Sequence, residues 1–174
     1  TKAGHDVEMI CLKDSRTNSG LKNDFKYGKR EGYVKGIKVI EFNIPYSNYD
    51  GILKRSLTFS FYSIRSSIKA LTTDADIIFS TSTPLTAGVP GIIGRWFKNI
   101  PFVFEVRDLW PELPKAMGIV KNPIILSLLT TLETLTYHSS DTCIGLAPGI
   151  CKGIEKKNIS VKKIHNIPNF SDLS

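Results

Sequence analysis

Two short segments combine hydroxyl, charged and aromatic residues in a way that suits recognition of a polar ligand. The first is Thr81-Ser82-Thr83, which follows an apolar run and precedes Pro84. Hydroxyls beside the free amides of a helix that begins at proline can bind an anion or the hydroxyls of a sugar. Ordinary helix capping by the same side chains is the alternative interpretation.

The second segment is EVRDLWPE, from Glu105 to Glu112, and it also follows an apolar run. Clustering charges at the end of a strand is costly unless they pair with each other or contact a ligand. Arg107 and Asp108 can present a charge pair, and Trp110 offers an aromatic face of the kind that stacks on sugar rings. The alternative is a structural network of arginine and carboxylates with Trp110 in the core.

Other chemistry-bearing residues are scattered. The histidines and cysteines lack metal-ligand spacing, and the chain has no GxGxxG, Walker loop or nucleophile elbow. We therefore expect no metal site and no bound cofactor.

A basic segment lies between Leu12 and Lys38, with eight lysines and arginines against three acids in a chain of net charge +7. Such a segment can meet anionic lipid headgroups, phosphorylated substrates or nucleic acid, or can remain a solvated loop. Nucleic acid is not an expected partner, because no aromatic stacking platform is interleaved with the charges. The candidate contacts with a membrane or another anion are Lys22, Lys26, Lys29 and Arg30.

The pattern of apolar residues predicts strands that alternate with helices. The predicted strands are 6–12, 33–44, 75–80, 101–106, 141–146 and 162–167, and the predicted helices are 51–71, 85–97, 123–138 and 148–157. This alternation predicts an α/β fold, with a parallel sheet that helices cover on both faces. Ligands bind beyond the carboxyl ends of such strands, where the two polar segments lie.

Two predicted helices carry apolar stripes. In 51–71 the stripe is Leu53, Leu57, Phe61, Ile64, Ile68 and Leu71, and in 123–138 it is Ile125, Leu128, Leu129, Leu132 and Leu135. We expect both stripes to face the core. For 51–71, a membrane-surface helix with a basic flank is the alternative.

Length and composition are those of one globular domain of 174 residues. No apolar run approaches the roughly 20 residues that span a bilayer, and no signal peptide is visible. We therefore expect the protein to be located in the cytosol. The first residues resemble the end of a helix followed by a strand, so we expect an initial strand to precede them.

In the region of its two polar segments, the chain resembles the N-terminal domain of the family 4 retaining glycosyltransferases of the GT-B fold. ADIIFSTSTPLTAGVPGIIGRWFKNI followed by PFVFEVRDLWPE carries the resemblance, which is greatest to the bacterial branch that builds polysaccharide and lipid-linked oligosaccharide units. KAGHDVEMI is similar to the family's entry into its second strand, and IHNIPNFSDLS to its connection into the second domain.

The resemblance implies a Rossmann-like, acceptor-side domain over residues 1–168, with 169–174 starting the linker to a donor-binding domain. It implies a nucleotide-sugar as co-substrate, a lipid-linked or glycan acceptor, and location at the inner face of the membrane. Arg107 stands where many members have a histidine, so Arg107 and Asp108 are the candidate catalytic residues. The candidate acceptor-binding residues are Thr81, Ser82, Thr83, Trp110 and Glu112.

Two alternatives stay open at this point. One is half of a nucleotide-sugar epimerase of similar fold, and the other is a basic binding module without catalysis. Without the donor-binding domain, we expect this chain by itself to be inactive in transfer.

Overall fold

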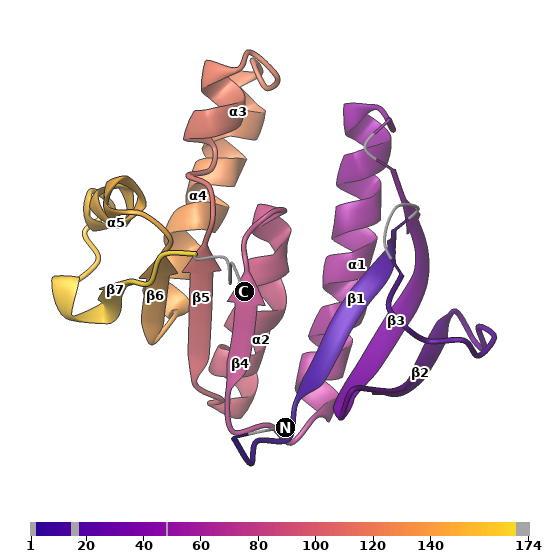
Figure 1. Cartoon of the computed structure of the whole chain (residues 1–174). Coiled ribbons are helices and arrows are strands. Elements are labelled where there is room, and N and C mark those ends of the chain that lie inside the picture. The colour runs from indigo at the N-terminus through magenta and orange to yellow at the C-terminus, as the bar shows by residue number, and fades with distance from the viewer. Residues whose placement is uncertain (1–2, 15–17, 48, 170–174) are drawn as a thin grey trace, which may run out of the picture. The chain divides into compact units, whose positions relative to one another are not determined.

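The computed structural model describes residues 3–14, 18–47 and 49–169, which form two compact units (Figure 1). The first unit ends at Ser66 and the second begins at Ser67. Among the described residues each unit has its own sheet, whereas the sequence predicted one parallel sheet.

The first unit contains a three-stranded sheet of order β1-β3-β2, built from β1 (Glu8–Asp14), β2 (Lys29–Val34) and β3 (Ile37–Tyr46). β1 runs parallel to β3, whereas β2 is antiparallel to it. The prediction of one strand over 33–44 is therefore wrong, because the chain reverses at Lys35 and Gly36. These two residues have φ of 50° and 82°, the left-handed geometry that a two-residue hairpin turn requires.

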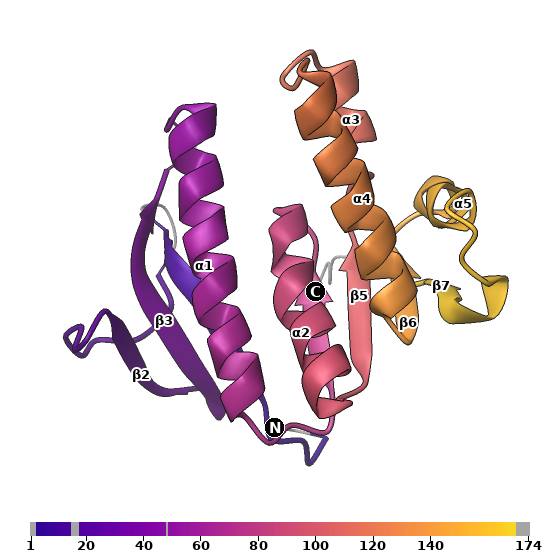
Figure 2. The ribbon, with the colours of Figure 1, turned by 180° about the vertical axis from the view of Figure 1, so that it is seen from behind.

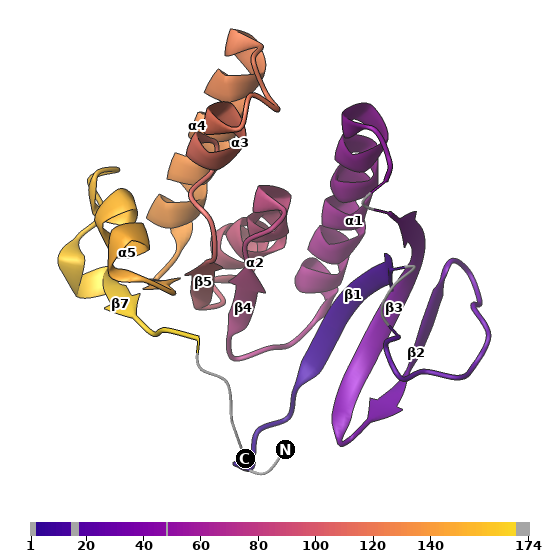
Figure 3. The same cartoon turned by 45° about the horizontal axis from the view of Figure 1, so that its top comes forward.

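Helix α1 (Ile52–Thr72) lies along one face of this sheet (Figure 3). Its packed side is aromatic and polar: Tyr62 donates a hydrogen bond to the Ile10 carbonyl at 3.0 Å and meets Phe42 edge-on, while Phe59 packs on Tyr46. Ser63 and Ser66 of the same side are buried.

The apolar stripe of α1 does not face the core, which corrects the expectation from the sequence. Five of its members, namely Leu53, Leu57, Phe61, Ile64 and Ile68, are between 53% and 75% exposed, and Leu71 is 42% exposed. At 100° per residue the stripe lies on the side of the helix opposite the aromatic side that the sheet covers. Periodicity identified an apolar face, but the sheet packs on the aromatic one.

The second unit contains a four-stranded parallel sheet of order β4-β5-β6-β7. Its strands are β4 (Ile78–Thr81), β5 (Phe102–Val106), β6 (Thr142–Gly145) and β7 (Ile164–Asn166). The helical segments between them are η1 (Leu85–Gly88), α2 (Val89–Lys98), α3 (Glu112–Ala116), α4 (Pro123–Ser139), α5 (Pro148–Glu155) and η2 (Val161–Lys163). Helices α2 and α4 lie side by side on one face of this sheet (Figure 2).

The core of this unit is centred on β5, where Phe102, Phe104 and Val106 have no exposed surface. Cys143 of β6 and Tyr137 of α4 belong to the same buried cluster, together with Leu85, Ile92, Ile154 and Ile159. The alternate residues of β5 are also partly buried, as expected for a strand inside a parallel sheet.

The predicted apolar stripe of α4 is only partly correct. Leu129 and Leu132 pack against the core, but Ile125, Leu128 and Leu135 are exposed. Glu133, Thr136 and Tyr137 occupy the buried face instead. A buried carboxylate requires partners, and those of Glu133 are described below.

The expected domain limit at residue 168 stays a prediction, and residues 170–174 of the expected linker lie outside the described residues.

We predict that Gly91→Ala destabilises the second unit. A Cβ at Gly91 would lie 2.1 Å from the ring of Phe102, so α2 would have to move away from β5. The expected loss is about 1–3 kcal/mol in the free energy of unfolding, measured by urea denaturation, despite the better helix propensity of alanine. Gly149→Ala is the matched control, since nothing lies within 4 Å of a Cβ there. Equal stability of the two variants would contradict the close approach of α2 and β5.

Candidate functional site

The site lies where the parallel strands of the second unit end. Thr81 of β4 pairs with Glu105 of β5, and Val106 pairs with Gly145 of β6. Because these strands point the same way and are in register, the segments that follow β4 and β5 emerge side by side. The two polar segments found in the sequence are therefore neighbours.

Ser82 joins the two segments through the backbone. Its amide donates to the Glu105 carbonyl at 2.8 Å, and its Oγ accepts a hydrogen bond from the Arg107 amide, also at 2.8 Å. The side chain is 2% exposed, so this hydroxyl is engaged inside the protein. Ser82 thus positions the backbone at Arg107, and its predicted contact with an acceptor stays a prediction.

Thr83 makes a second link, because its Oγ1 donates to Asp108 Oδ2 at 3.0 Å. Its backbone has φ of 88°, a region that a β-branched residue occupies only at an energetic cost. Surrounding contacts therefore hold Thr83 in this conformation, in which its hydroxyl orients the Asp108 carboxylate.

An open hollow of about 380 Å³ lies beside these links, within the size range of small-ligand sites. Three charged residues, Arg107, Asp108 and Glu112, line it together with apolar side chains. The apolar lining consists of Leu109, Leu113, Ala116 and Ile150. A few charges on an apolar floor can orient a polar ligand while they cover its less polar parts.

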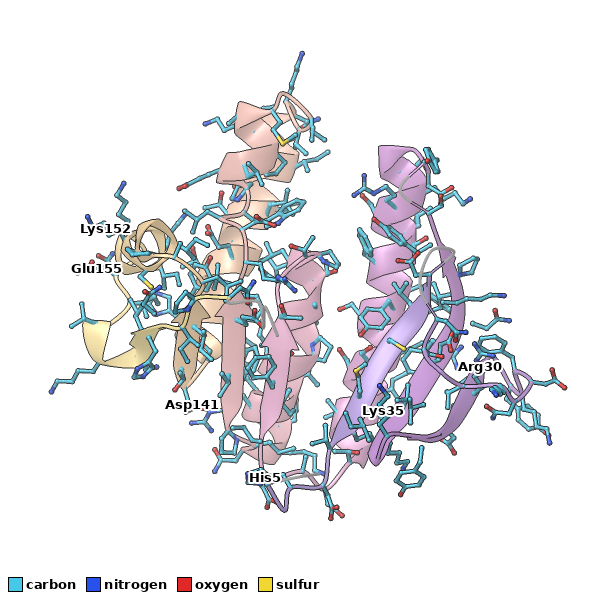
Figure 4. The ribbon with its side chains drawn as sticks, in the orientation of Figure 1. His5, Arg30, Lys35, Asp141, Lys152 and Glu155 are labelled. Atoms are coloured by element: carbon cyan, nitrogen blue, oxygen red, sulfur yellow. The ribbon has the colours of Figure 1, made fainter. Side chains whose placement is uncertain are left out.

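Helix α5 supplies the far wall of the hollow through Ile150. It approaches the loop closely at Gly153, where a Cβ would lie 2.4 Å from Leu109 Cδ1. Lys152 and Glu155 project from α5 into solvent (Figure 4). The apolar side of α5 therefore faces the loop that carries the charged residues.

The remaining predicted site residues have different surroundings. Thr81 is exposed at the end of β4, and Trp110 packs against the core of the second unit without lining the hollow. Its indole Nε1 is buried and has no hydrogen-bond partner among the described residues. The structure thus supports the alternative in which Trp110 belongs to the core.

A buried network in α4 was missed by sequence reasoning. Glu133 has no exposed surface; its Oε2 lies 2.7 Å from Lys157 Nζ, and its Oε1 accepts from the Tyr137 hydroxyl at 3.1 Å. Burial raises the pKa of Glu133, and the Lys157 and Tyr137 contacts oppose that rise only in part, while the charge of Glu112 adds to it. The available signal was the single acidic residue of the α4 sequence.

The opposite edge of this sheet is held by an ion pair. Asp141 lies at the amino-terminal edge (Figure 4), where its Oδ2 accepts from the Phe102 amide at 2.9 Å and lies 3.0 Å from Arg95 Nε. These contacts are far from the strand ends that carry the hollow, and they fix β5 relative to β6.

The basic residues of the first unit differ in how far they are engaged. Arg30 is largely buried, lies 2.8 Å from Glu41 through Nε and stacks on Phe25 (Figure 4). It therefore has a structural role, and its predicted contact with a membrane or another anion stays a prediction. Lys29 lies 3.2 Å from Glu31. Lys22 and Lys26 are exposed.

A further hollow of about 400 Å³ lies on the surface of α4. Two of its three threonine hydroxyls are used within the helix: Thr130 donates to the Leu126 carbonyl and Thr131 to the Ser127 carbonyl. This surface lacks convergent polar groups. Over the described ranges 3–14, 18–47 and 49–169, no cluster of metal-ligating residues was found.

Comparison with known families agrees with this geometry. The family model of the glycosyl transferase 4-like domain matches residues 1–169, which is nearly the whole chain. The chain belongs to the glycosyl transferase 4-like family. No match was found among curated proteins.

Membership confirms the resemblance drawn from EVRDLWPE and the expected fold. The parallel sheet with its helices is the Rossmann-like arrangement of the N-terminal domain of the GT-B fold. The glycosyl transferase 4-like family is one of transferases that use nucleotide-sugar donors. Of the helices within the described residues, none combines the length and apolar character needed to cross a bilayer.

We predict that Ser82→Ala loosens the strand ends. The Arg107 amide would lose its acceptor, which costs about 1–3 kcal/mol when the donor is left buried. Urea denaturation should show this loss, and hydrogen exchange should show faster exchange of the Arg107 amide. Ser160→Ala is the control, because that serine is exposed and makes no capping hydrogen bond through its side chain. Unchanged exchange at Arg107 would exclude the positioning role.

We also predict a pH-dependent contribution of Glu133. Its pKa in the folded protein is raised above the ordinary value of 4.5, so the folded state holds the proton more tightly than the unfolded state does. As pH rises from 4.5, the free energy of unfolding of the parent should therefore fall relative to that of Glu133→Gln. Parallel urea titrations of both proteins measure this difference. A parent that instead gains stability relative to Glu133→Gln as pH rises would show that the Lys157 ion pair outweighs burial.

Proposed function

We propose that this chain is the acceptor-side domain of a glycosyltransferase that transfers a sugar from a nucleotide-sugar to a lipid-linked or polysaccharide acceptor. The observation that carries the proposal is the hollow at the ends of β4 and β5, where Arg107, Asp108 and Glu112 converge. Membership of the glycosyl transferase 4-like family supports the reaction class.

Within this proposal, Arg107 binds an anionic group of the acceptor. Its guanidinium is exposed at the hollow, and no described contact ties it to a carboxylate. Arginine presents paired N–H donors that match a phosphate or a carboxylate. The backbone of Arg107 is held by Ser82, so only the side chain needs to adjust to the ligand.

Asp108 orients the acceptor hydroxyl. Its Oδ2 is held by Thr83, which leaves Oδ1 to accept a hydrogen bond from a sugar hydroxyl. Glu112, the first residue of α3, adds a second carboxylate at the rim of the hollow. Leu113 and Ala116 continue the lining as an apolar surface for the less polar part of the acceptor.

The nucleotide-sugar is handled by a donor-binding domain outside these residues, which is why we propose that the chain by itself does not catalyse transfer. The described residues offer no glycine-rich phosphate loop and no paired carboxylates of the kind that the family uses for the donor. The acceptor hydroxyl oriented at Asp108 would meet the donor sugar across the mouth of the hollow.

We predict that transfer depends on Arg107 and Asp108. Transfer from a panel of nucleotide-sugars to a membrane extract would be measured for a two-domain protein that carries this domain. Arg107→Ala and Asp108→Ala should each lower kcat/KM by about 100-fold or more, as expected when a charged contact to the reacting sugars is removed. Lys152→Ala is the matched control, because Lys152 is exposed on α5 away from the hollow.

The same assay includes the outcomes that would overturn the proposal. If Arg107→Ala and Asp108→Ala have the same kcat/KM as the parent, the acceptor site does not lie in this hollow, although the description of the fold still holds. Conversion of the free nucleotide-sugar without transfer would indicate an epimerase instead. Transfer by the 174-residue chain alone would contradict the assignment to the acceptor side.

A further inference from the structure

Thr83 lies in a backbone conformation that threonine avoids. Its φ is 88°, and its position before Pro84 adds a second constraint, because a residue that precedes proline prefers extended conformations with negative φ. The branched Cβ of threonine makes a positive φ costlier still, whereas glycine would adopt it without this cost. A residue held at such a cost directs attention to what its side chain does.

The segments on both sides of Thr83 impose this conformation. Before it, Ser82 is 2% exposed and donates its amide to a carbonyl of β5. After it, Leu85 is buried, and Gly88 approaches α4 so closely that a Cβ there would lie 2.5 Å from Thr136 Cγ2. These contacts fix the path of the chain without the Thr83 side chain, so the fold does not require a hydroxyl at this position.

The Thr83 hydroxyl does not cap the helical segment that follows it. Neither η1 nor α2 has a side-chain hydrogen bond at its N-cap, so the helix-capping interpretation of this segment does not apply to Thr83. Its Oγ1 donates instead to Asp108 Oδ2, 25 positions later in the chain. This bond restricts rotation of the carboxylate about its last torsion and leaves Oδ1 as the oxygen that can accept from a ligand.

We propose that Thr83 is a positioning residue of the transfer reaction, which holds the Asp108 carboxylate in one orientation toward the acceptor hydroxyl. The inference rests on the proposed role of Asp108. A carboxylate that rotates freely meets the hydroxyl in the productive geometry only part of the time, and a displacement of about 1 Å can lower a rate about 100-fold. The strained backbone of Thr83 is the conformation that brings its hydroxyl to Asp108, and Thr83 acts without touching the reacting atoms.

Substitutions that separate the hydroxyl from the shape of Thr83 test the proposal in the two-domain protein. Initial rates at increasing amounts of membrane extract give kcat and the half-saturating amount of extract. Thr83→Val keeps the branched shape but loses the hydroxyl, so kcat should fall about 10- to 100-fold while the half-saturating amount stays within about twofold. Thr83→Ser keeps the hydroxyl and should stay within about threefold of the parent. The matched control is Thr131→Val, on the exposed side of α4, which should equal the parent.

A double-mutant cycle tests whether Thr83 acts through Asp108. In the Asp108→Ala background there is no carboxylate to orient, so adding Thr83→Val should change the residual transfer by less than about twofold. If Thr83 only supported the fold, the same substitution would lower transfer by a similar factor in both backgrounds. The cycle therefore distinguishes a positioning residue from a structural one.

Thr83→Gly tests the strain separately from the transfer reaction. Glycine removes the hydroxyl and relieves the backbone together, whereas valine removes the hydroxyl and keeps the branched Cβ. In urea denaturation of the 174-residue chain, Thr83→Gly should therefore unfold at a higher urea concentration than Thr83→Val. In the two-domain protein, Thr83→Gly should nevertheless transfer as slowly as Thr83→Val, because both variants lack the donor to Asp108.

The outcomes that overturn the inference differ from those that overturn the proposed function. If Asp108→Ala lowers transfer but Thr83→Val does not, the positioning role is wrong and the proposed function stands. A higher half-saturating amount of extract at unchanged kcat would show that Thr83 contacts the acceptor itself. If Thr83→Gly is the least stable variant, the conformation of Thr83 is not strained. If neither Asp108→Ala nor Arg107→Ala lowers transfer, the proposed function and the positioning role are both wrong.

Discussion

The candidate site depends on the parallel, in-register pairing of β4 with β5. Because Thr81 lies opposite Glu105, the residues that follow the two strands are brought within hydrogen-bond distance of each other. Ser82 then accepts from the Arg107 amide, and Thr83 reaches Asp108. The Ser82 hydroxyl makes the first link to the Arg107 backbone, and the hydroxyl of Thr83, whose backbone lies in the left-handed region, makes the second. A slip of the register by one residue would separate both pairs and would turn Arg107 to the other face of the sheet.

Close packing beneath these links keeps the strand ends in place. Phe102 of β5 lies against Gly91 of α2, and Leu109 of the loop after β5 lies against Gly153 of α5, so both helices approach to distances that a Cβ would prevent. The buried Glu133 joins α4 to Lys157 just after α5. A fully buried carboxylate contributes little net stability by itself, but removing one partner leaves a costly charge. The network therefore restricts how α4 and the segment after α5 can be arranged around the hollow.

The two units carry different kinds of exposed residues. The second unit carries the hollow and its charged residues, whereas the first carries most of the exposed apolar stripe of α1 and the basic segment. In the first unit, Glu41 is buried and occupied by Arg30, which fixes the loop that leads to Tyr27 and Lys26. Arg30 thus serves the fold of the first unit.

The sequence by itself determined the class of fold, the order of its helices and most strands, and the two segments that build the site. These are local properties: an apolar run, a proline and a cluster of charges are visible without a partner. It also determined the family, because EVRDLWPE and the segment before it are contiguous. The tertiary structure alone decided which helix face meets a sheet, since both faces of α1 carry large apolar or aromatic residues and only packing selects between them. It also decided that Ser82 and Arg30 are engaged, that Trp110 joins the core and that Glu133 is buried with Lys157. Each of these contacts joins residues that are distant in the chain, so it cannot be inferred from their spacing in the sequence.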